Sequence, residues 1–410
     1  MLNRIYRRPF KLFNKIQHYD WGTKGDNAFI PHFVGSPVVR DLPYAELWIG
    51  AHPTAPSDIV VQGRVSPLNK VVEDFPLEIL GEDVARRFDN KLPFLLKVLS
   101  AARALSIQTH PNKEQARKLH SADPAHYPDD NHKPEIAIAL EPLTAIAGFR
   151  PAMDIVRSLH RYPELHDFAG SEIVRRVLAA GSESELVGNL KLLYGAIMRR
   201  AADKEALVPV IERIVDRLSR RGDLAADELH FVEQYGLYGA DVGLFSFLFF
   251  NLLQLKPGQA IFTDAGVPHA YIKGNIVECM ANSDNVVRAG LTGKFKDVEA
   301  LLDILTYRFA EYTVINQEQK TDGVVYRTSA EEFEITGYQK DRRFDAMFES
   351  GTKPVLVLTA GGSLTVQWED EGERGSEVFT KGESFLIPAM LSQWQMSCTE
   401  NVRFFSVSIP

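Results

Sequence analysis

The sequence LPFLLKVLSAARALSIQTHP, residues 92–111, decides the fold class of this 410-residue chain. Short apolar runs alternate here with turn-forming residues, and the pattern continues in KPEIAIALEPLTAIAGF, residues 133–149. Apolar runs of this length, bounded by Pro, Asp and Asn, are typical of strands joined by turns. We therefore predict that the chain from about residue 90 to 150 is all β.

Between about residues 151 and 240 the spacing of the apolar residues changes. They recur at intervals of three and four, which places them on one face of a helix. This part of the chain is therefore predicted to be helical. Two series carry the pattern: Leu186, Leu190, Leu193 and Ile197, and then Ile211, Ile214, Val215 and Leu218.

Strand-like patterns return in LFSFLFFNLLQLKPGQAIFT, residues 244–263, and again in the last hundred residues, where GG, EGERG and KGE mark turns. The apolar run from Leu244 to Phe250 is too short to span a bilayer, and we expect a buried strand there. A short helix is expected at KDVEALLDIL, residues 296–305. Because strands and helices are segregated, a Rossmann or TIM fold is disfavoured. We predict a mainly β protein with an α-helical insertion, built from jelly rolls.

Composition excludes several classes of protein. The length allows two or three domains, and 45% hydrophobic with 24% charged residues is ordinary for a folded chain. A net charge of −8, without long runs of like charge, disfavours nucleic-acid and membrane partners. The basic N-terminus lacks the apolar core of a secretory signal. With only Cys279 and Cys398 in the chain, both expected to be buried, we predict a cytoplasmic protein without disulfides.

Three separate segments offer metal-ligating side chains. Alternation along an extended strand places Ser106, Gln108 and His110 on one face. The same alternation pairs Lys133 with Glu135 in KPE and pairs His269 with Tyr271 in HAY. Ligand-type groups that occur together in this order favour a metal site. On spacing alone, Glu114 rivals Glu135 as the carboxylate ligand.

Two of these segments resemble cupin motifs. Gly258, five residues, Asp264-Ala265-Gly266, two residues and His269 resemble the second motif, in which the histidine points toward a metal inside the barrel. The first motif normally supplies His-x-His, and here the match is Gln108-Thr109-His110. An amide oxygen in place of an imidazole argues against redox iron. We expect one zinc ion per chain.

Longer stretches resemble the type I mannose-6-phosphate isomerases over nearly the whole chain. The resemblance implies a cupin catalytic domain, a helical domain and a second jelly roll, and hence an aldose–ketose isomerase acting on a sugar phosphate. Thr109 and Gly293 depart from the residues common in the family. The matching motifs are YDWG (19–22), AELWIGAHP (45–53), PFLLKVLS (93–100), SIQTHPNK (106–113), NHKPEI (131–136) and VPHAYIKGNIVECMANSDNVVRAGLTGKFKDV (267–298).

From the resemblance, the metal ligands are Gln108, His110, Glu135 and His269, and Arg288 is the active-site arginine. We place the catalytic domain at residues 1–150 and 241–310, the helical domain at 151–240 and the C-terminal jelly roll at 311–410. In the last of these, cupin-like spacing ends in Gln393 in place of a histidine, so a second metal is not expected.

Moving a proton between adjacent sugar carbons through an enediol requires a base, a polarising group and a phosphate contact. For the base we favour Glu278, because burial raises the pKa of a carboxylate, and Lys133 is the rival. Arg288 is expected to stabilise the enediolate. The residues expected to bind the substrate are Trp21, Glu46, Lys97, Ser106, Tyr271, Asp284 and Lys294. Among these, Lys97, Ser106 and Lys294 are candidates for the phosphate contact, and Glu46 is expected to support a ligand or a lysine.

Two alternatives remain open from the sequence. One is an isomerase of free mannose, which would not need the phosphate contacts. The other is a non-catalytic, sugar-binding cupin, since one fold hosts many functions. We expect a monomer.

Overall fold

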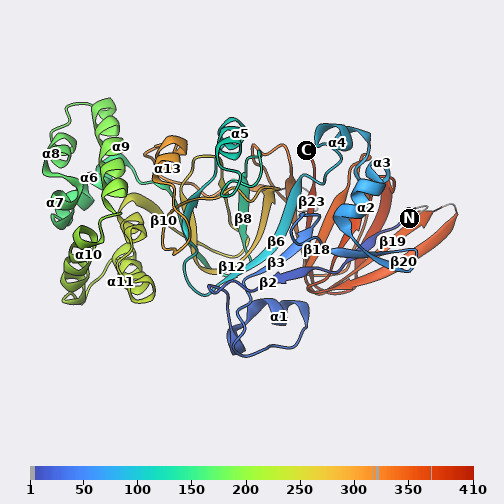
Figure 1. Ribbon diagram of the computed structural model, residues 1–410. Coiled ribbons are helices and arrows are strands. Elements are labelled where there is room, and N and C mark those ends of the chain that lie inside the picture. The colour runs from blue at the N-terminus through green and yellow to red at the C-terminus, as the bar shows by residue number, and fades with distance from the viewer. Residues whose placement is uncertain (1–4, 316, 320–322, 371) are drawn as a thin grey trace.

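The computed structural model describes residues 5–315, 317–319, 323–370 and 372–410. Figure 1 shows three parts in a row: a helical part at one end, a β-rich part in the centre, and a second β-rich part at the other end. The predicted fold class, β-rich with a helical insertion, is confirmed.

The central part is an antiparallel ten-stranded sheet. Its longest strand is β12 (His269–Ala281), which pairs with four other strands. Residues 269–273 of β12 pair with β7 and β9, and residues 274–281 pair with β6 and β8. The change of partner falls at Gly274, where φ is +136° and a Cβ would lie 2.6 Å from the carbonyl oxygen of Pro142. The other strands of the sheet are β2 (Lys15–Gln17), β3 (Glu46–Gly50), β6 (Phe94–Ala101), β7 (Ile107–Thr109), β8 (Glu135–Ala139), β9 (Leu143–Phe149), β10 (Phe250–Leu255), β11 (Ala260–Thr263) and β13 (Val287–Gly290).

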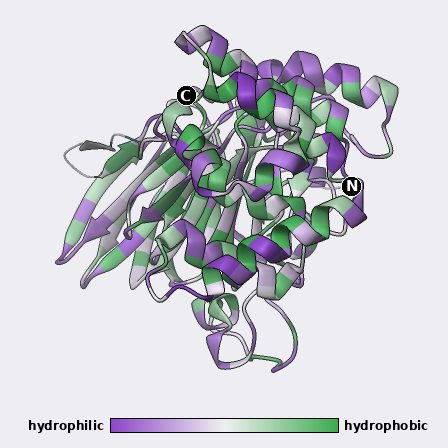
Figure 2. Cartoon of the chain, turned by 90° about the vertical axis from the view of Figure 1, so that its left-hand side faces the viewer, coloured by the Kyte–Doolittle hydropathy of each residue, from purple (hydrophilic) through white to green (hydrophobic). Residues whose placement is uncertain are grey.

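The helical part follows the predicted apolar spacing. Figure 2 looks onto this end, where hydrophilic and hydrophobic residues alternate along the helices, as in amphipathic helices that cover a core. Ser182 and Asp203 cap the two longest helices by accepting hydrogen bonds from the backbone. The helices are α6 (Ala152–Arg161), α7 (Glu164–Ala169), α8 (Ser171–Leu178), α9 (Glu183–Arg200), α10 (Lys204–Ser219) and α11 (Ala226–Tyr238).

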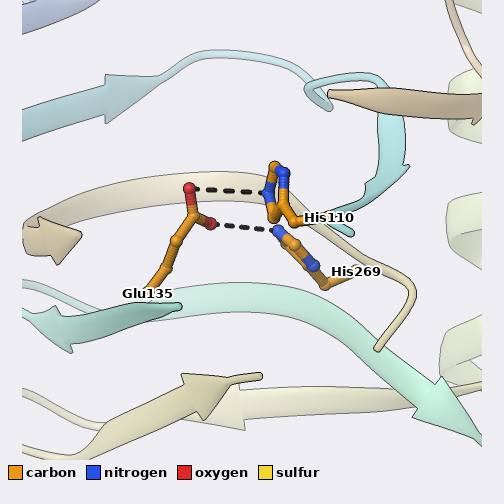
Figure 3. Close-up of side chains that lie close together, drawn as sticks. All are labelled: His110, Glu135 and His269. Carbon is orange, nitrogen blue, oxygen red and sulfur yellow. Dashed lines mark hydrogen bonds and ion pairs between the residues drawn. The ribbon is translucent and has the colours of Figure 1, made fainter. Parts of the chain in front are cut away.

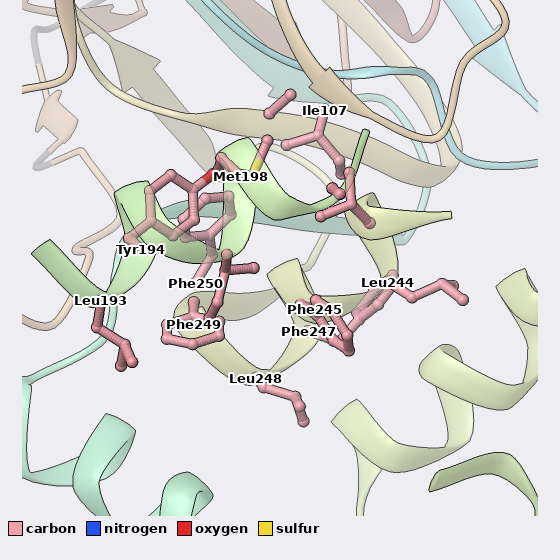
Figure 4. Close-up of a cluster of buried hydrophobic side chains, with 14 of the residues drawn as sticks. Ile107, Leu193, Tyr194, Met198, Leu244, Phe245, Phe247, Leu248, Phe249 and Phe250 are labelled. Atoms are coloured by element: carbon pink, nitrogen blue, oxygen red, sulfur yellow. The ribbon is translucent and has the colours of Figure 1, made fainter. Parts of the chain in front are cut away.

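The strand predicted from Leu244 to Phe250 is wrong over most of its length. The chain forms a 3-10 turn, η2 (Val242–Phe245), then a helical turn, α12 (Ser246–Phe249), and becomes extended only in β10. Figure 4 shows Phe249 and Phe250 beside Tyr194 of α9. Phe245 instead lies 6.5 Å from Phe231 of α11 between ring centres. Because every side of the segment is buried, its sequence has no period that separates a strand from a helix.

The C-terminal part consists of a seven-stranded and a four-stranded antiparallel sheet packed around a shared apolar core. The seven-stranded sheet also includes β1 (Phe10–Leu12), which pairs with β21, so the N-terminus contributes to a part that the sequence assigned to residues 311–410 alone. The remaining strands are β14 (Gln317–Gln319), β15 (Val324–Tyr326), β16 (Glu334–Lys340), β17 (Phe344–Glu349), β18 (Val355–Gly361), β19 (Ser363–Asp370), β20 (Glu373–Thr380), β21 (Ser384–Ile387), β22 (Gln393–Cys398) and β23 (Val402–Ser408).

Short helices and strands flank the sheets, and those in the first 90 residues were not predicted from the sequence. Among the described residues, no helix combines the length and apolar character needed to cross a membrane. The short elements are α1 (Phe29–Val34), β4 (Asp58–Val61), β5 (Arg64–Pro67), α2 (Leu68–Asp74), α3 (Pro76–Leu80), α4 (Glu82–Arg87), α5 (Lys113–Ala122) and α13 (Val298–Ile304), together with the 3-10 turn η1 (Gly25–Asn27).

Candidate metal centre and active site

Three side chains from separate segments converge inside the central part (Figure 3). His110 follows β7, Glu135 begins β8 and His269 begins β12. The Nε2 atom of His269 lies 3.1 Å from Oε2 of Glu135, and the Nε2 atom of His110 lies 3.5 Å from Oε1. One ligand atom from each residue falls within 4.8 Å of the others, and all three side chains are buried. A carboxylate and two imidazoles arranged in this way form a possible metal site.

The two histidine rings are oriented by backbone carbonyls. Nδ1 of His110 lies 2.7 Å from the carbonyl oxygen of Asn285, and Nδ1 of His269 lies 3.0 Å from that of Val267. When Nδ1 donates to a carbonyl, Nε2 is left unprotonated and free to bind a metal. Burial lowers the pKa of His110 to about 4, which favours this neutral form. Nε2 of His110 is buried without a hydrogen-bond partner among the described residues, which fits a metal ligand.

Sheet register adds Gln108 and Arg288 to this arrangement. Gln108 of β7 lies opposite His269 on β12 and opposite Arg288 on β13. Residues directly opposite each other in an antiparallel pair share one face of the sheet. Gln108 is therefore on the same face as the histidine and the arginine.

A cavity of about 420 Å³ opens beside the three buried side chains. His110 and His269 are fully buried, whereas Gln108 and Glu135 line the cavity wall. The residues expected to carry the chemistry or to bind the substrate also line it: Trp21, Glu46, Lys97, Ser106, Lys133, Tyr271, Glu278, Asp284, Arg288 and Lys294.

Lys133 and Glu135, which alternation along KPE places on one face, form a buried ion pair. Nζ of Lys133 lies 3.0 Å from Oε1 of Glu135. Burial opposes ionisation of Glu135, but the charge of Lys133 and the close approach of the two histidines outweigh it and hold the pKa of Glu135 well below its usual value. Glu135 is therefore a carboxylate, the form that binds a metal.

Lys97 lies between two buried carboxylates that also line the cavity. Its Nζ atom is 3.3 Å from Oε2 of Glu46 and 3.3 Å from Oε2 of Glu278, and it lies 5.2 Å from the ring centre of Trp48. Burial raises the pKa of Glu278, although Lys97 acts in the opposite direction. Since both carboxylates engage Lys97, this buried lysine is less available to a phosphate than Lys294, which lines the same cavity and is exposed.

Three comparisons with known proteins agree. A family model described as the catalytic domain of phosphomannose isomerase type I matches residues 9–152. The mannose-6-phosphate isomerase of Ogataea parapolymorpha is 42% identical over 388 residues, which cover 88% of this chain and 90% of that protein. The chain belongs to the mannose-6-phosphate isomerase family. The human member is 41% identical over 318 residues, 73% of each chain.

Solved structures of this family superpose closely. A mutant phosphomannose isomerase from Salmonella typhimurium matches 98% of this chain and 99% of its own, with a TM-score of 0.85 and 30% identity. A mannose 6-phosphate isomerase bound with zinc and yttrium matches the same shares with a TM-score of 0.84 and 29% identity. The family fold therefore extends over nearly the whole chain.

The cavity of this family member also includes residues that the sequence did not single out. Arg103 forms an ion pair with Asp20 and lies 5.3 Å from the ring centre of Tyr238, the last residue of α11. All three line the cavity, so the helical part contributes to its wall. Asp20 lies within the YDWG motif, whereas Arg103 and Tyr238 carry no local signal and are brought together only by the fold.

Two further residues considered from the sequence, Lys294 and Glu114, lie in different surroundings. Lys294 lies 5.6 Å from the ring centre of Tyr19, which stacks on Trp21 with 5.8 Å between ring centres. By contrast, Glu114, the rival carboxylate ligand, is exposed on α5 and pairs with Lys118 at 2.7 Å. It is therefore not part of the buried group.

Proposed function

We propose that this protein is a zinc-dependent isomerase that interconverts mannose 6-phosphate and fructose 6-phosphate through an enediol. Membership of the mannose-6-phosphate isomerase family supports the reaction. The observation that carries the proposal is the convergence of His110, Glu135 and His269 beside a cavity that also holds Glu278, Lys133 and Arg288.

Gln108, His110, Glu135 and His269 would hold the zinc ion. The donors fit, because they comprise one carboxylate, two imidazoles held as neutral ligands and an amide oxygen on the same face. When bound, zinc supplies Lewis-acid stabilisation of negative charge on the sugar oxygens.

Glu278 is the proposed base, and Lys133 is the alternative. Transfer of a proton between C1 and C2 requires a group that ionises near the working pH, and burial moves the pKa of Glu278 in that direction. Lys133 is engaged by Glu135 at 3.0 Å, which ties it to the metal centre. Glu278 instead pairs at 3.3 Å with Lys97, which is not a proposed metal ligand, and it is therefore the preferred candidate for shuttling the proton.

Arg288 is proposed to stabilise the enediolate through its planar donors. Its position opposite Gln108 places it on the same face as the proposed ligands. Ser106 and Lys294 are proposed to bind the phosphate, with Trp21, Tyr271 and Asp284 lining the sugar site. The cations on the cavity wall favour a phosphorylated sugar over free mannose. The presence of Arg288, Lys133 and Glu278 favours catalysis over sugar binding alone.

The decisive experiment is a coupled assay with mannose 6-phosphate and fructose 6-phosphate. We expect turnover in both directions, loss of activity after chelation, and recovery on adding zinc. In Lys294→Ala, KM for the sugar phosphate should rise, whereas Lys118→Ala, at an exposed lysine on α5, should behave as the wild type. A zinc-loaded wild-type protein without turnover would refute the function.

We further propose that the enzyme acts as a monomer in the cytoplasm and binds neither nucleic acid nor membranes. Cys279 and Cys398 are buried and unpaired, as is common in a reducing compartment. The net charge of −8 disfavours a polyanionic partner. Light scattering of the purified protein would test the monomer, which a dimer mass would contradict.

A further inference from the structure

A buried carboxylate from the C-terminal part contacts both segments that lead to the metal centre. Glu332 precedes β16 and is 2% exposed. Its Oε1 atom accepts a hydrogen bond from Nε2 of His132 at 2.7 Å and lies 3.1 Å from Nζ of Lys113. Its Oε2 atom is buried and has no hydrogen-bond partner among the described residues.

The two partners of Glu332 flank the proposed ligands. Lys113 is three residues after His110 and begins α5, whose first turn is fixed by a capping box at Asn112. His132 is three residues before Glu135, and the intervening Pro134 restricts the backbone. One carboxylate oxygen therefore links the segment that carries a histidine ligand to the segment that carries the carboxylate ligand.

Glu332 is itself held in place by its neighbours. Phe333 is 1% exposed and belongs to an apolar core that includes Leu96 and Ile136 of the central sheet and Phe405 of the C-terminal sheet. Burial opposes ionisation of Glu332, but its bonds to His132 and Lys113 lower its pKa to about 2. The group is thus a fixed anion at neutral pH.

We propose that Glu332 is a positioning residue that sets the spacing between the His110 and Glu135 segments and thereby strengthens zinc retention. The inference rests on the proposed zinc-dependent function. The C-terminal jelly roll, whose own cupin-like motif ends in Gln393, would in this way take part in the metal site of the central part.

The physical reason is preorganisation. Metal ligands must be held within a few tenths of an ångström of their bonded positions, and groups behind the ligands supply that constraint. Without the negative charge of Glu332, Lys113 and His132 lose the anion that holds the two together. The His110 and Glu135 segments can then move relative to each other, and zinc dissociates more readily.

The test compares Glu332→Gln with Arg403→Gln as a matched control. Arg403 also joins the C-terminal part to the central sheet, but its guanidinium donates to the carbonyl oxygens of Ala139 and Leu140, both at 3.4 Å, at the far end of β8 from Glu135. Both variants weaken the contact between the two parts. Only Glu332 contacts residues within three positions of a proposed ligand.

The measurement is the rate at which zinc passes from each loaded protein to a chromogenic chelator. We expect about tenfold faster release from Glu332→Gln and a near wild-type rate from Arg403→Gln. Lys113→Met, which removes one partner at a half-exposed position, should give a smaller acceleration in the same direction. This third variant keeps the test valid if Glu332→Gln folds poorly.

Equal acceleration in both main variants would overturn the inference, because it would indicate a general effect of docking between the two parts. An unchanged rate in folded Glu332→Gln would also overturn it. If the wild type holds zinc and isomerises the sugar phosphate in either case, the proposed function stands. A wild type that binds no zinc would overturn both.

Discussion

At the scale of single residues, the cavity separates two kinds of buried carboxylate. Glu135 is surrounded by Lys133 and two histidines and is held ionised. Glu278 faces Lys97, but burial dominates and raises its pKa. Two carboxylates whose environments push their pKa values apart are suited to different tasks, ligation for the first and proton transfer for the second.

The first prediction concerns Glu278. Glu278→Gln should lower kcat by about 10²- to 10⁴-fold with zinc retained, because the amide cannot accept the proton. Since the base must be ionised and its pKa is raised, kcat/KM of the wild type should fall on the acid side at a pH above the usual range of a glutamate. Steady-state kinetics across pH, with zinc content measured in parallel, check both points. Full activity in Glu278→Gln would shift the assignment to Lys133.

At the scale of elements, the loop between β12 and β13 orients His110 of the metal centre through hydrogen bonds. Asp129 accepts hydrogen bonds from Ser283 Oγ at 2.8 Å, from the Asp284 amide at 2.8 Å and from Asn285 Nδ2 at 3.1 Å. The carbonyl of Asn285 then orients His110. A side chain outside the cavity thereby fixes a proposed ligand inside the barrel.

The second prediction follows from this network. Asp129→Ala should weaken zinc binding by about 10- to 100-fold, because loosening Asn285 frees the His110 ring. Competition with a chelator of known affinity gives the measurement. Asp123→Ala is the control, since the Asp123 side chain contacts His126 at the protein surface. Equal zinc affinity in Asp129→Ala and the wild type would contradict the prediction.

The third prediction concerns the point at which β12 changes partners. Gly274→Ala should destabilise the protein by about 2 kcal/mol or more, because φ is +136° and the new Cβ would meet the Pro142 carbonyl. Gly188→Ala, in open space on α9, should instead stabilise it by roughly 0.5–1 kcal/mol. Denaturant unfolding of the two variants measures the contrast, and similar shifts in both would show that the backbone at Gly274 is not constrained.

At the scale of the whole molecule, the central and C-terminal parts share one apolar core and the buried Glu332 cluster. The ordinary pKa of a glutamate near 4.5 is lowered at Glu332 to about 2 in the folded protein. A lowered folded-state pKa gives stability that is complete above the unfolded value and is lost as pH falls toward the folded value. The contact between the central and C-terminal parts should therefore become less stable in acid.

The fourth prediction tests this linkage in zinc-free protein. Near pH 6 the wild type should exceed Glu332→Gln by roughly 2 kcal/mol in free energy of unfolding, less than for a fully buried pair because Lys113 is half exposed. The difference should shrink between about pH 4.5 and 2. As a control, Glu349→Gln, which changes an exposed side chain of the C-terminal part, should show no such change of stability with pH. A difference that does not change with pH would contradict the assigned pKa.

The chain sequence alone was sufficient to predict the β-rich fold, the helical insertion and the segments that meet at the metal centre. Strand alternation predicts that Lys133 lies beside Glu135, because only neighbouring residues are involved. The division into domains at residues 150, 240 and 310 remains a prediction. Local periodicity is a dependable signal wherever one face is apolar and the other is not.

Tertiary structure alone decided the rest. The buried run from Leu244 to Phe249, interrupted only by Ser246, has no polar face, so only its packing against the surrounding helices and strands selects a helical turn. Pairing of β1 with β21, the contact between Arg103 and Tyr238 and the bridge from Glu332 to Lys113 join residues far apart in the chain. Such contacts depend on how whole elements close around a shared core, which no local pattern of residues encodes.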